Sequence, residues 1–210
     1  EFQYSATSPQ ITQVVDGRVT YPVLNTALRV VTAAAVKEQA NGRVLVKAAK
    51  DDGSGNLTPL IAAEKVALEA YLSRIGFVGI PIDVTSQQPD RVRLTNFKIY
   101  YLRQYVLADI KAAVNLTVAT YLKEISTTNF DGIIVRSDLI DRLQLVTGVV
   151  TISDYNAGPI LRDFATVAPS GVFINVQRET AAGYAIAEDA TGYTLDDEII
   201  YLTDDLIPNI

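Results

Sequence analysis

Cysteine, histidine, methionine and tryptophan are all missing from this sequence. Without cysteine there is no disulfide, no thiolate nucleophile and no cysteine-based metal site. Without histidine there is no Ser-His-Asp triad, no histidine-ligated zinc and no imidazole pH switch. Because an initiator methionine is lacking, we expect further residues before Glu1 in the full-length protein. Carboxylate chemistry remains as the main catalytic option to weigh.

Clustered positive charge is missing as well. The 210 residues carry a net charge of −6, and the 18 Lys and Arg residues are scattered along the chain. Since contacts to phosphates need clustered basic side chains, we expect no nucleic-acid partner. No apolar run approaches the ~20 residues that cross a bilayer, and no signal peptide is visible, so we expect no membrane partner. A hydrophobic content of 49% is ordinary for a folded protein.

The first half of the chain predicts an irregular arm followed by helices and strands. Residues 1–26 are rich in Ser, Thr, Gln and Pro and predict an arm with one or two short strands. Good helix formers over 26–39 predict a helix that stops at Asn41-Gly42, although the Val and Thr residues also allow a strand over part of it. Thr58-Pro59 predicts the start of another helix. That helix is expected to run to Ile75. Strands are expected at 43–50, 80–85 and 92–101.

The second half predicts a long helix and then shorter elements. Apolar side chains with helical spacing predict a helix over 107–125. Ser137, helped by Asp138 in the first turn, is expected to cap a second helix. A connecting loop is expected at 154–170. The buried face of the long helix is expected to carry Ile110, Val114, Val118, Tyr121, Leu122 and Ile125. Extended segments are expected at 133–135, 149–153, 172–179, 183–189 and 198–205.

This order predicts an α+β fold with two small, similar α/β units followed by a β-rich C-terminal segment. The similarity rests on an xYLxxI pattern, which occurs in 66–76 and again in 116–126. A duplicated unit and a chance match are both open interpretations of this pattern. The expected parts are an N-terminal arm at 1–26, a first α/β unit at 27–103, a second at 104–160, and the β-rich segment at 161–210.

The loop DDGSGN at 51–56 is the first candidate for chemistry. Asp52, Ser54 and Asn56 have the alternating oxygens of a calcium loop, and Glu64 falls near its distal acidic position. A proline and an early helix start disrupt the usual frame of such a loop, so a solvated connection is the favoured interpretation. Neither a glycine-rich phosphate-binding pattern nor a strand-borne acidic pair for Mg²⁺ accompanies it. We therefore expect no cofactor or metal residue here.

Paired acidic residues are the second candidate. They occur at Asp196-Asp197-Glu198 and at Asp204-Asp205. Glycosidase-type catalysis needs two carboxyl groups that face one cleft, one of them with a raised pKa. Adjacent acids flanked by turn residues near the chain end are typical of a solvated surface, so we expect no catalytic residue among them.

Tyrosine is the third notable feature, with eleven residues in the chain. Tyr184, Tyr193 and Tyr201 lie in the β-rich C-terminal segment. Tyrosine anchors many protein interfaces, and it is also simply favoured in strands. Packing within the fold and contact with a protein partner are both open, and these three residues are the interface candidates.

The order of the segments resembles a known family. A strand RVLVKAAK is followed by the glycine-rich loop, a Pro-Leu helix start and a helix that ends in Tyr-Leu. A glycine turn, VTS before Pro89-Asp90, and a long strand come next. Later come a helix with Tyr-Leu, the segment FDGIIVRSDLIDRLQLVTGV, and AGYAIAED. The sequence from about residue 26 to 203 thereby resembles the phage baseplate J-like family, of the type found in Bacteroidetes phages, whose members are baseplate wedge proteins.

The resemblance implies a scaffold of a phage-tail or contractile-injection baseplate with no catalytic, cofactor-binding or metal-binding residues. It implies that the partners are other baseplate and tail proteins and further copies of the chain in a symmetric assembly. The location implied is the virion tail, after assembly in the cytoplasm of the bacterial host. We expect the N-terminal arm and the β-rich C-terminus to contact partners. Alternatives are a carboxylate- and Mg²⁺-dependent enzyme, nucleotidyltransferase-like or carbohydrate-active, and a cell-surface adhesion module.

Overall fold

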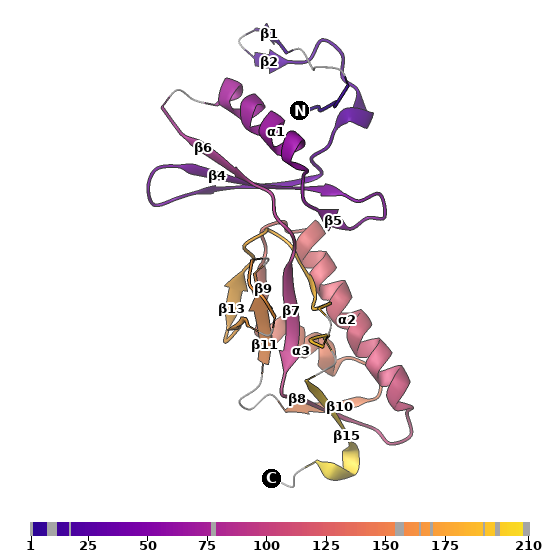
Figure 1. The fold of residues 1–210 in the computed structure, drawn as a ribbon. Helices are drawn as coiled ribbons and strands as arrows, with labels where there is room; N and C mark the ends of the chain where they lie inside the picture. Colours follow the sequence, from indigo (N-terminus) through magenta and orange to yellow (C-terminus); the bar gives the residue numbers. More distant parts are fainter. Residues whose placement is uncertain are drawn as a thin grey trace. The chain divides into compact units, whose positions relative to one another are not determined.

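The computed structural model describes residues 2–7, 12–16, 18–76, 79–153, 158–163, 165–168, 170–190, 192–195 and 198–207. It has a mixed α+β fold with a β-rich part, which confirms the predicted fold class. The chain divides into two compact units, Glu1–Gln88 (unit 1) and Pro89–Ile210 (unit 2) (Figure 1). The sequence suggested boundaries after residues 26, 103 and 160 instead. Within the described ranges, no helix combines the length and the apolar character needed to cross a bilayer.

Unit 1 is built around a central strand, β4 (Val44–Asp51). β4 pairs antiparallel with β3 (Ala33–Glu38) and parallel with β6 (Ile82–Thr85). β5 (Leu57–Thr58) pairs with the end of β4, and α1 (Ala62–Ile75) connects β5 to β6 (Figure 1). The apolar core of unit 1 consists of Val46, Ala48, Leu60, Leu68 and Val84.

The predicted arm contains two short strands. β1 (Gln13–Val15) and β2 (Arg18–Thr20) form an antiparallel ribbon. A short 3-10 helix, η1 (Thr26–Leu28), follows the ribbon, and the side chain of Asn25 caps it by accepting from the N–H of Ala27. The arm thus enters the sheet through an irregular connection.

The predicted helix at 26–39 is wrong, because only its first residues are helical and its end is strand β3. The strand register runs from Ala33 opposite Ala49 to Glu38 opposite Val44. Asn41-Gly42, expected to stop a helix, lies in the hairpin loop between β3 and β4. Gly42 has a φ of 74°, and its N–H donates to the carbonyl of Gln39. A loop that ends in a left-handed glycine is a common hairpin connection. Cross-strand pairing therefore outweighed local helix propensity.

The predicted cap at Thr58 is also wrong, because Thr58 belongs to β5, opposite Lys50. The helix begins at Ala62, and the carboxylate of Glu64 accepts a 2.8 Å hydrogen bond from the N–H of Ile61 at its start. The N–H of Leu60 donates instead to Ser86 Oγ at 2.8 Å. A carboxylate in the first turn thus takes over the role expected of a threonine cap.

The two larger sheets in the described part of unit 2 share one bent stretch of chain. The predicted strand at 92–101 is two strands, β7 (Asp90–Thr95) and β8 (Phe97–Tyr101). Asn96 separates them with a φ of 53°, a left-handed conformation that asparagine tolerates better than most residues. The strand order in one sheet is β12 (Val172–Phe173), β11 (Gly158–Arg162), β7 and β14 (Ala185–Ala187). In the other it is β10 (Val149–Ser153), β8 and β15 (Ile199–Thr203). Asn96 therefore marks the passage from one sheet to the next.

The predicted long helix is confirmed as α2 (Leu107–Thr127), and all six expected side chains of its inner face are buried. They pack with Val92, Leu94, Phe97 and Ile99 in the core of unit 2. The remaining elements of unit 2 are β9 (Ile133–Val135), α3 (Arg136–Gln144), β13 (Gln177–Glu179) and η2 (Asp204–Leu206).

Two further expectations in unit 2 are corrected. The loop expected at 154–170 contains β11, an inner strand that pairs with both β7 and β12. Gly158-Pro159 suggested a turn, but the carbonyl of Pro159 accepts from the N–H of Ile174, so the proline lies within the sheet. Ser137 is not the cap of α3, because the helix already begins at Arg136 and Ser137 lies in its first turn. Asp138 does lie in the first turn, as predicted.

The helices that share the xYLxxI pattern lie in different topologies. β6, which follows α1, pairs in parallel with β4, so that β4, α1 and β6 form a β-α-β arrangement. β9, which follows α2, pairs antiparallel with β13 from much later in the chain. The matched residues Tyr121, Leu122 and Ile125 are buried in α2, whereas their α1 counterpart Ile75 is exposed. Neither the burial nor the strand connections around the two helices repeat.

Candidate functional site

The three tyrosines that the sequence singled out lie in different environments. Tyr184 is 1% exposed, and its ring lies 6.2 Å from that of Phe130. Burial raises the pKa of its hydroxyl group. Tyr193 is half-buried, with the guanidinium of Arg93 5.5 Å from its ring centre. Tyr201 is half-buried on β15 with the ammonium of Lys111 5.2 Å from its ring. Tyr184 thus packs inside unit 2, while the other two keep part of their surface accessible.

The 51–56 loop is held by its own acidic side chains. Asp51 Oδ1 accepts from the N–H groups of Gly53 and Gly55 at 2.5 and 3.2 Å. Asp52 Oδ1 accepts from the N–H of Ser54 at 2.7 Å, and this bond lowers the pKa of Asp52. Glu64, which falls near the distal acidic position of a calcium loop, accepts from Lys50 Nζ at 2.8 and 2.9 Å. The loop therefore has the hydrogen bonding of a solvated turn.

The described acidic residues near the end of the chain each interact with a different partner. Glu198 forms an ion pair with Arg93 at 3.5 Å, and Asp204 pairs with Arg103 at 3.7 Å. A hydrogen bond from Thr203 lowers the pKa of Asp205. Asp196 and Asp197 lie outside the described residues. Among the residues that are described, no three acidic side chains come together in a way that could hold a metal ion.

The densest group of charges in unit 2 is a network on one face of the β12-β11-β7-β14 sheet. Arg91 and Arg93 alternate with Val92 and Leu94 along β7, so both arginines point away from the apolar core. Arg162 on β11 lies directly opposite Arg91. We call the three arginines together with Glu188, Asp189 and Glu198 the arginine network.

The buried centre of the arginine network is the pair formed by Arg162 and Glu188. Arg162 Nε donates to Glu188 Oε2 at 2.8 Å, and Arg162 Nη2 donates to the other carboxylate oxygen. Burial alone would raise the pKa of Glu188, but hydrogen bonds from Arg162 and from the N–H of Ala190 outweigh it and lower the pKa. Arg162 also donates to the carbonyl of Thr166, and Arg91 pairs with Asp189 at 2.6 Å. The network therefore ties Thr166 and the 188–190 stretch to the sheet.

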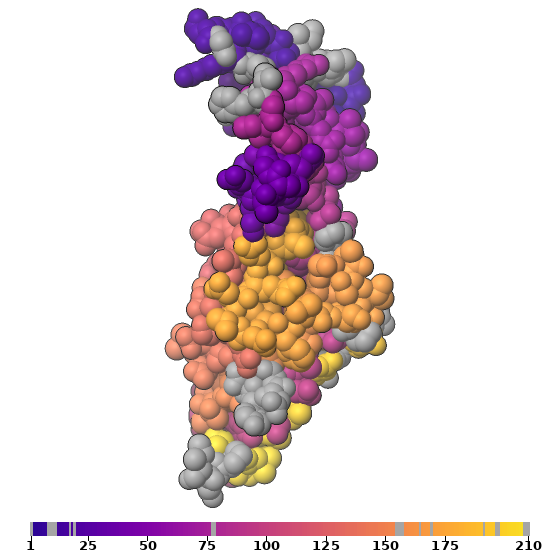
Figure 2. All heavy atoms as spheres, turned by 90° about the vertical axis from the view of Figure 1, so that its left-hand side faces the viewer, coloured from indigo at the N-terminus to yellow at the C-terminus, as the bar shows by residue number. Residues whose placement is uncertain are grey.

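Exposed apolar side chains occur along much of the described chain, and two stretches each carry four of them. One stretch belongs to the N-terminal arm and the loop that follows it: Val14, Val15, Val23 and Leu24. The other, which we call segment 167–176, carries Val167, Val172, Phe173 and Val176. Its strand β12 lies at the edge of its sheet. Figure 2 shows that the orange and light-orange part of the chain, after residue 150, covers much of the visible face of unit 2.

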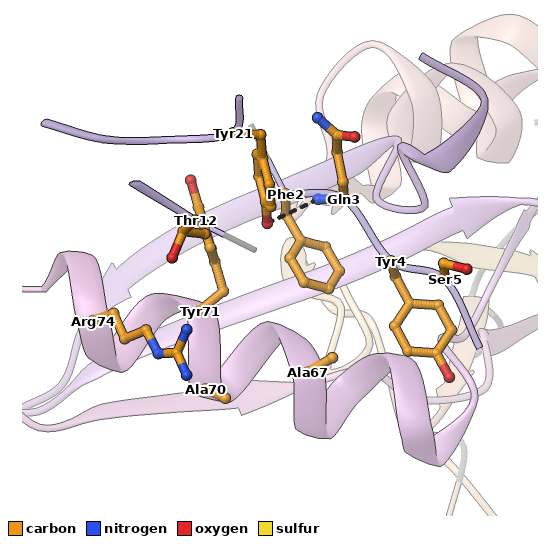
Figure 3. Close-up of a pocket in the computed structure, with 10 residues that line it drawn as sticks. All are labelled: Phe2, Gln3, Tyr4, Ser5, Thr12, Tyr21, Ala67, Ala70, Tyr71 and Arg74. Atoms are coloured by element: carbon orange, nitrogen blue, oxygen red, sulfur yellow. Dashed lines mark hydrogen bonds between the residues drawn. The ribbon is translucent and has the colours of Figure 1, made fainter. Parts of the chain in front are cut away.

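A pocket of about 260 Å³ lies in unit 1 between the first residues of the chain and α1 (Figure 3). Its walls include aromatic rings and its floor small side chains. The ring of Tyr71 lies 5.6 Å from that of Phe2, and 5.9 Å from that of Tyr21 in a nearly parallel stack. The lining residues are Phe2, Gln3, Tyr4, Ser5, Thr12, Tyr21, Ala67, Ala70, Tyr71 and Arg74.

Gln3 holds the N-terminal wall of this pocket in place. Its side chain is buried and accepts from the N–H of Asn25 at 3.1 Å while it donates to the carbonyl of Val23 at 3.3 Å. Its own N–H donates to the hydroxyl of Tyr21 at 3.2 Å (Figure 3). The N–H of Tyr4 donates to the carbonyl of Leu28 at 2.9 Å. These bonds fix residues 3 and 4 against the fold, so the pocket is formed before any ligand arrives.

Sequence reasoning did not anticipate the arginine network or the pocket. The alternation in Arg91-Val92-Arg93-Leu94 was a usable signal, because it places both arginines on one face of a strand. Their acidic partners come from nearly a hundred residues later in the chain, and nothing local indicates the pairing. The pocket combines the N-terminal segment with α1, and this also depends on tertiary packing.

A scan against models of known protein families finds no match for this sequence, and no curated protein matches it. The baseplate J-like resemblance therefore rests on the segment order described above and stays a prediction.

Proposed function

We propose that this chain is a structural component of a phage-tail or contractile-injection baseplate, a wedge-like scaffold that acts through protein–protein interfaces. Its partners are other baseplate and tail proteins and further copies of the chain. Its location is the tail baseplate of a virion, which assembles in the host cytoplasm. The proposal is supported by the segment order between residues 26 and 203 and by the apolar surface of segment 167–176.

Segment 167–176 is the observation that carries the proposal. Burying a valine or phenylalanine side chain contributes roughly 1.5–3 kcal/mol, so leaving four of them in water is unfavourable unless a partner covers them. Two of these side chains, Val172 and Phe173, lie on the edge strand β12. An edge strand also offers backbone N–H and C=O groups to an added strand. The open backbone groups of β12, with the exposed Val172 and Phe173 on either side of the strand, suit an extended segment of another subunit.

Hydrogen bonds on both sides of β12 support the same interpretation. Arg162 holds the loop before β12 through the carbonyl of Thr166. Ile174, just after β12, donates to Pro159 on β11. A surface that is already ordered loses little conformational entropy when it binds, which favours a stable assembly interface.

The test is co-expression of the chain with the tail proteins encoded beside it, followed by size-exclusion chromatography and cross-linking. Replacing Val172, Phe173 and Val176 together with serine should weaken the complex at least tenfold. Leu116→Ser serves as the matched control, because Leu116 is 68% exposed on α2 and should leave the complex intact. Absence of any complex with tail proteins, or equal assembly by the triple variant, would contradict the proposal.

These point variants are preferable to a deletion of 172–210. β14 pairs with β7 and β15 pairs with β8, so a deletion removes strands from both of the larger sheets of unit 2. Its effect on assembly would be inseparable from unfolding. Hydrogen exchange of β7 and β8 in the triple variant shows whether unit 2 is still folded.

A further inference from the structure

We propose that the pocket of unit 1 binds the C-terminal residue of a partner protein, with its apolar side chain in the hollow and its carboxylate beside Arg74. This inference rests on the proposed function in one respect only, namely that the ligand is a protein chain.

The hollow exists because α1 presents small side chains there. Ala67 and Ala70 are three residues apart and lie on the same face of the helix. With Tyr71 and Arg74 they form the helical side of the pocket, opposite the N-terminal residues (Figure 3). At about 260 Å³ the space is smaller than the roughly 300–1,000 Å³ of pockets for drug-sized ligands. It therefore suits one amino-acid residue better than a larger molecule.

The positive charge of Arg74 favours a negatively charged ligand. Among the described lining residues it is the one charged side chain, and no described acidic side chain forms an ion pair with it. A guanidinium offers paired N–H donors that match the two oxygens of a carboxylate. The hydroxyl groups of Ser5 and Thr12 line the same space and can add hydrogen bonds to an anion. The pocket thus combines an aromatic, apolar part with a carboxylate-binding part.

Among ligands that carry a carboxylate, the small pocket favours the C-terminal residue of a chain. One residue must supply both an apolar group and a carboxylate a few ångströms away. An aspartate or glutamate within a chain has its carboxylate on its only side chain and brings no apolar group. A C-terminal apolar residue carries both on the same Cα. A phosphate group would lack the apolar part and would meet a single arginine.

The test uses N-acetyl-phenylalanine and its uncharged amide as probes, titrated into the ¹⁵N-labelled chain and followed by NMR. The acid should shift the signals of Ala67, Ala70 and Tyr71 and should bind at least tenfold more tightly than the amide. Arg74→Gln should reduce this preference to less than twofold. Equal binding of acid and amide to the wild type, or no shift at these residues, would overturn the proposal.

Two substitutions on α1 separate filling of the hollow from damage to the helix. Ala70→Leu should abolish binding of both probes, because the larger side chain occupies the space. Ala63→Leu, at an exposed position of α1 outside the pocket, should bind as the wild type does. Leucine is a good helix former, so neither change disfavours α1. Binding by Ala70→Leu at wild-type affinity would refute the assigned site.

A peptide probe distinguishes a protein terminus from a free metabolite. A pentapeptide ending in phenylalanine should bind at least as tightly as N-acetyl-phenylalanine, while the same peptide with a C-terminal amide should not. If only the single amino acid binds, the pocket takes a small carboxylate and the proposal is refuted. The baseplate proposal is tested on segment 167–176 with tail proteins, so either proposal can fail while the other stands.

Discussion

Replacing Arg162 with methionine should destabilise unit 2 by about 3–4 kcal/mol. The side chains of Arg162 and Glu188 are only 10% and 2% exposed, so the variant leaves a buried carboxylate without its main partner. Breaking a buried ion pair by removing one member typically costs 3–5 kcal/mol. We expect the lower part of that range because Arg91 lies 3.8 Å from Glu188 and the N–H groups of Asp189 and Ala190 still donate to it.

The double variant Arg162→Met with Glu188→Leu should be within about 1 kcal/mol of the wild type, because two apolar side chains of similar volume can replace a buried ion pair. Arg91 keeps its 2.6 Å ion pair with Asp189 in this variant, so no second charge loses its partner. A large loss in the single variant and a small one in the double variant is the pattern that a coupled buried pair requires.

The pair also predicts how stability depends on pH. The pKa of Glu188 is lowered in the folded state, so its ionised form stabilises the fold at pH values above its unfolded pKa of about 4.3. This contribution is lost as the pH falls through the lower folded pKa. The difference in unfolding free energy between the wild type and Glu188→Gln should therefore be largest near neutral pH and should shrink below about pH 4.

Hydrogen exchange of peptides that cover β11 and β14 measures the opening free energy of unit 2 separately from that of unit 1. Arg43→Met is the matched control, because Arg43 and Asp83 form an ion pair whose side chains are 40% and 39% exposed. Its effect, read from peptides that cover β4 and β6 of unit 1, should be much smaller than that of Arg162→Met, because solvent screens an exposed ion pair. The reasoning fails if Arg162→Met costs no more than Arg43→Met, or if the effect of Glu188→Gln is constant from pH 7 to 3.

Three further predictions concern single positions in unit 2. Asn96→Ala should destabilise unit 2 by about 1–2 kcal/mol, because alanine disfavours the left-handed backbone, whereas Asn96→Gly should cost less. Urea titration compares the two variants, and equal losses would contradict the assigned role of Asn96. Tyr121→Phe should cost about 1–3 kcal/mol in the same assay, because the hydroxyl group donates to the C=O of Val135 and accepts from its N–H. Unchanged stability would exclude a stabilising role of these two hydrogen bonds. Leu122→Ala should cost about 2–5 kcal/mol, whereas Leu116→Ala on the exposed face of α2 should cost less than about 0.5 kcal/mol. Similar losses would contradict the assignment of Leu122 to the buried face and Leu116 to the exposed face.

The parts of the fold that the sequence predicted correctly are those where the local signal is long. α2 repeats its apolar spacing over 21 residues, so its extent and its buried face both follow from periodicity. The stretch at 26–39 is short, mixes Ala with Val and Thr, and fits a helix or a strand equally well. Its conformation is decided by pairing with β4, which lies beyond the hairpin. β11 was missed because Gly158-Pro159 is a local turn signal, although the carbonyl of the proline completes a sheet contact.

Functional positions were harder to predict, since residue type alone does not determine exposure. Tyrosine suits both a core and an interface, and Tyr184 is buried although it was an interface candidate alongside Tyr201. That the arm and the β-rich C-terminus contact partners stays a prediction, and the arm and segment 167–176 both carry exposed apolar side chains. Valine dominates both stretches and carries no functional signal in a sequence. Only the structure separates a valine that packs inside, such as Val118, from one that a partner would have to cover, such as Val176.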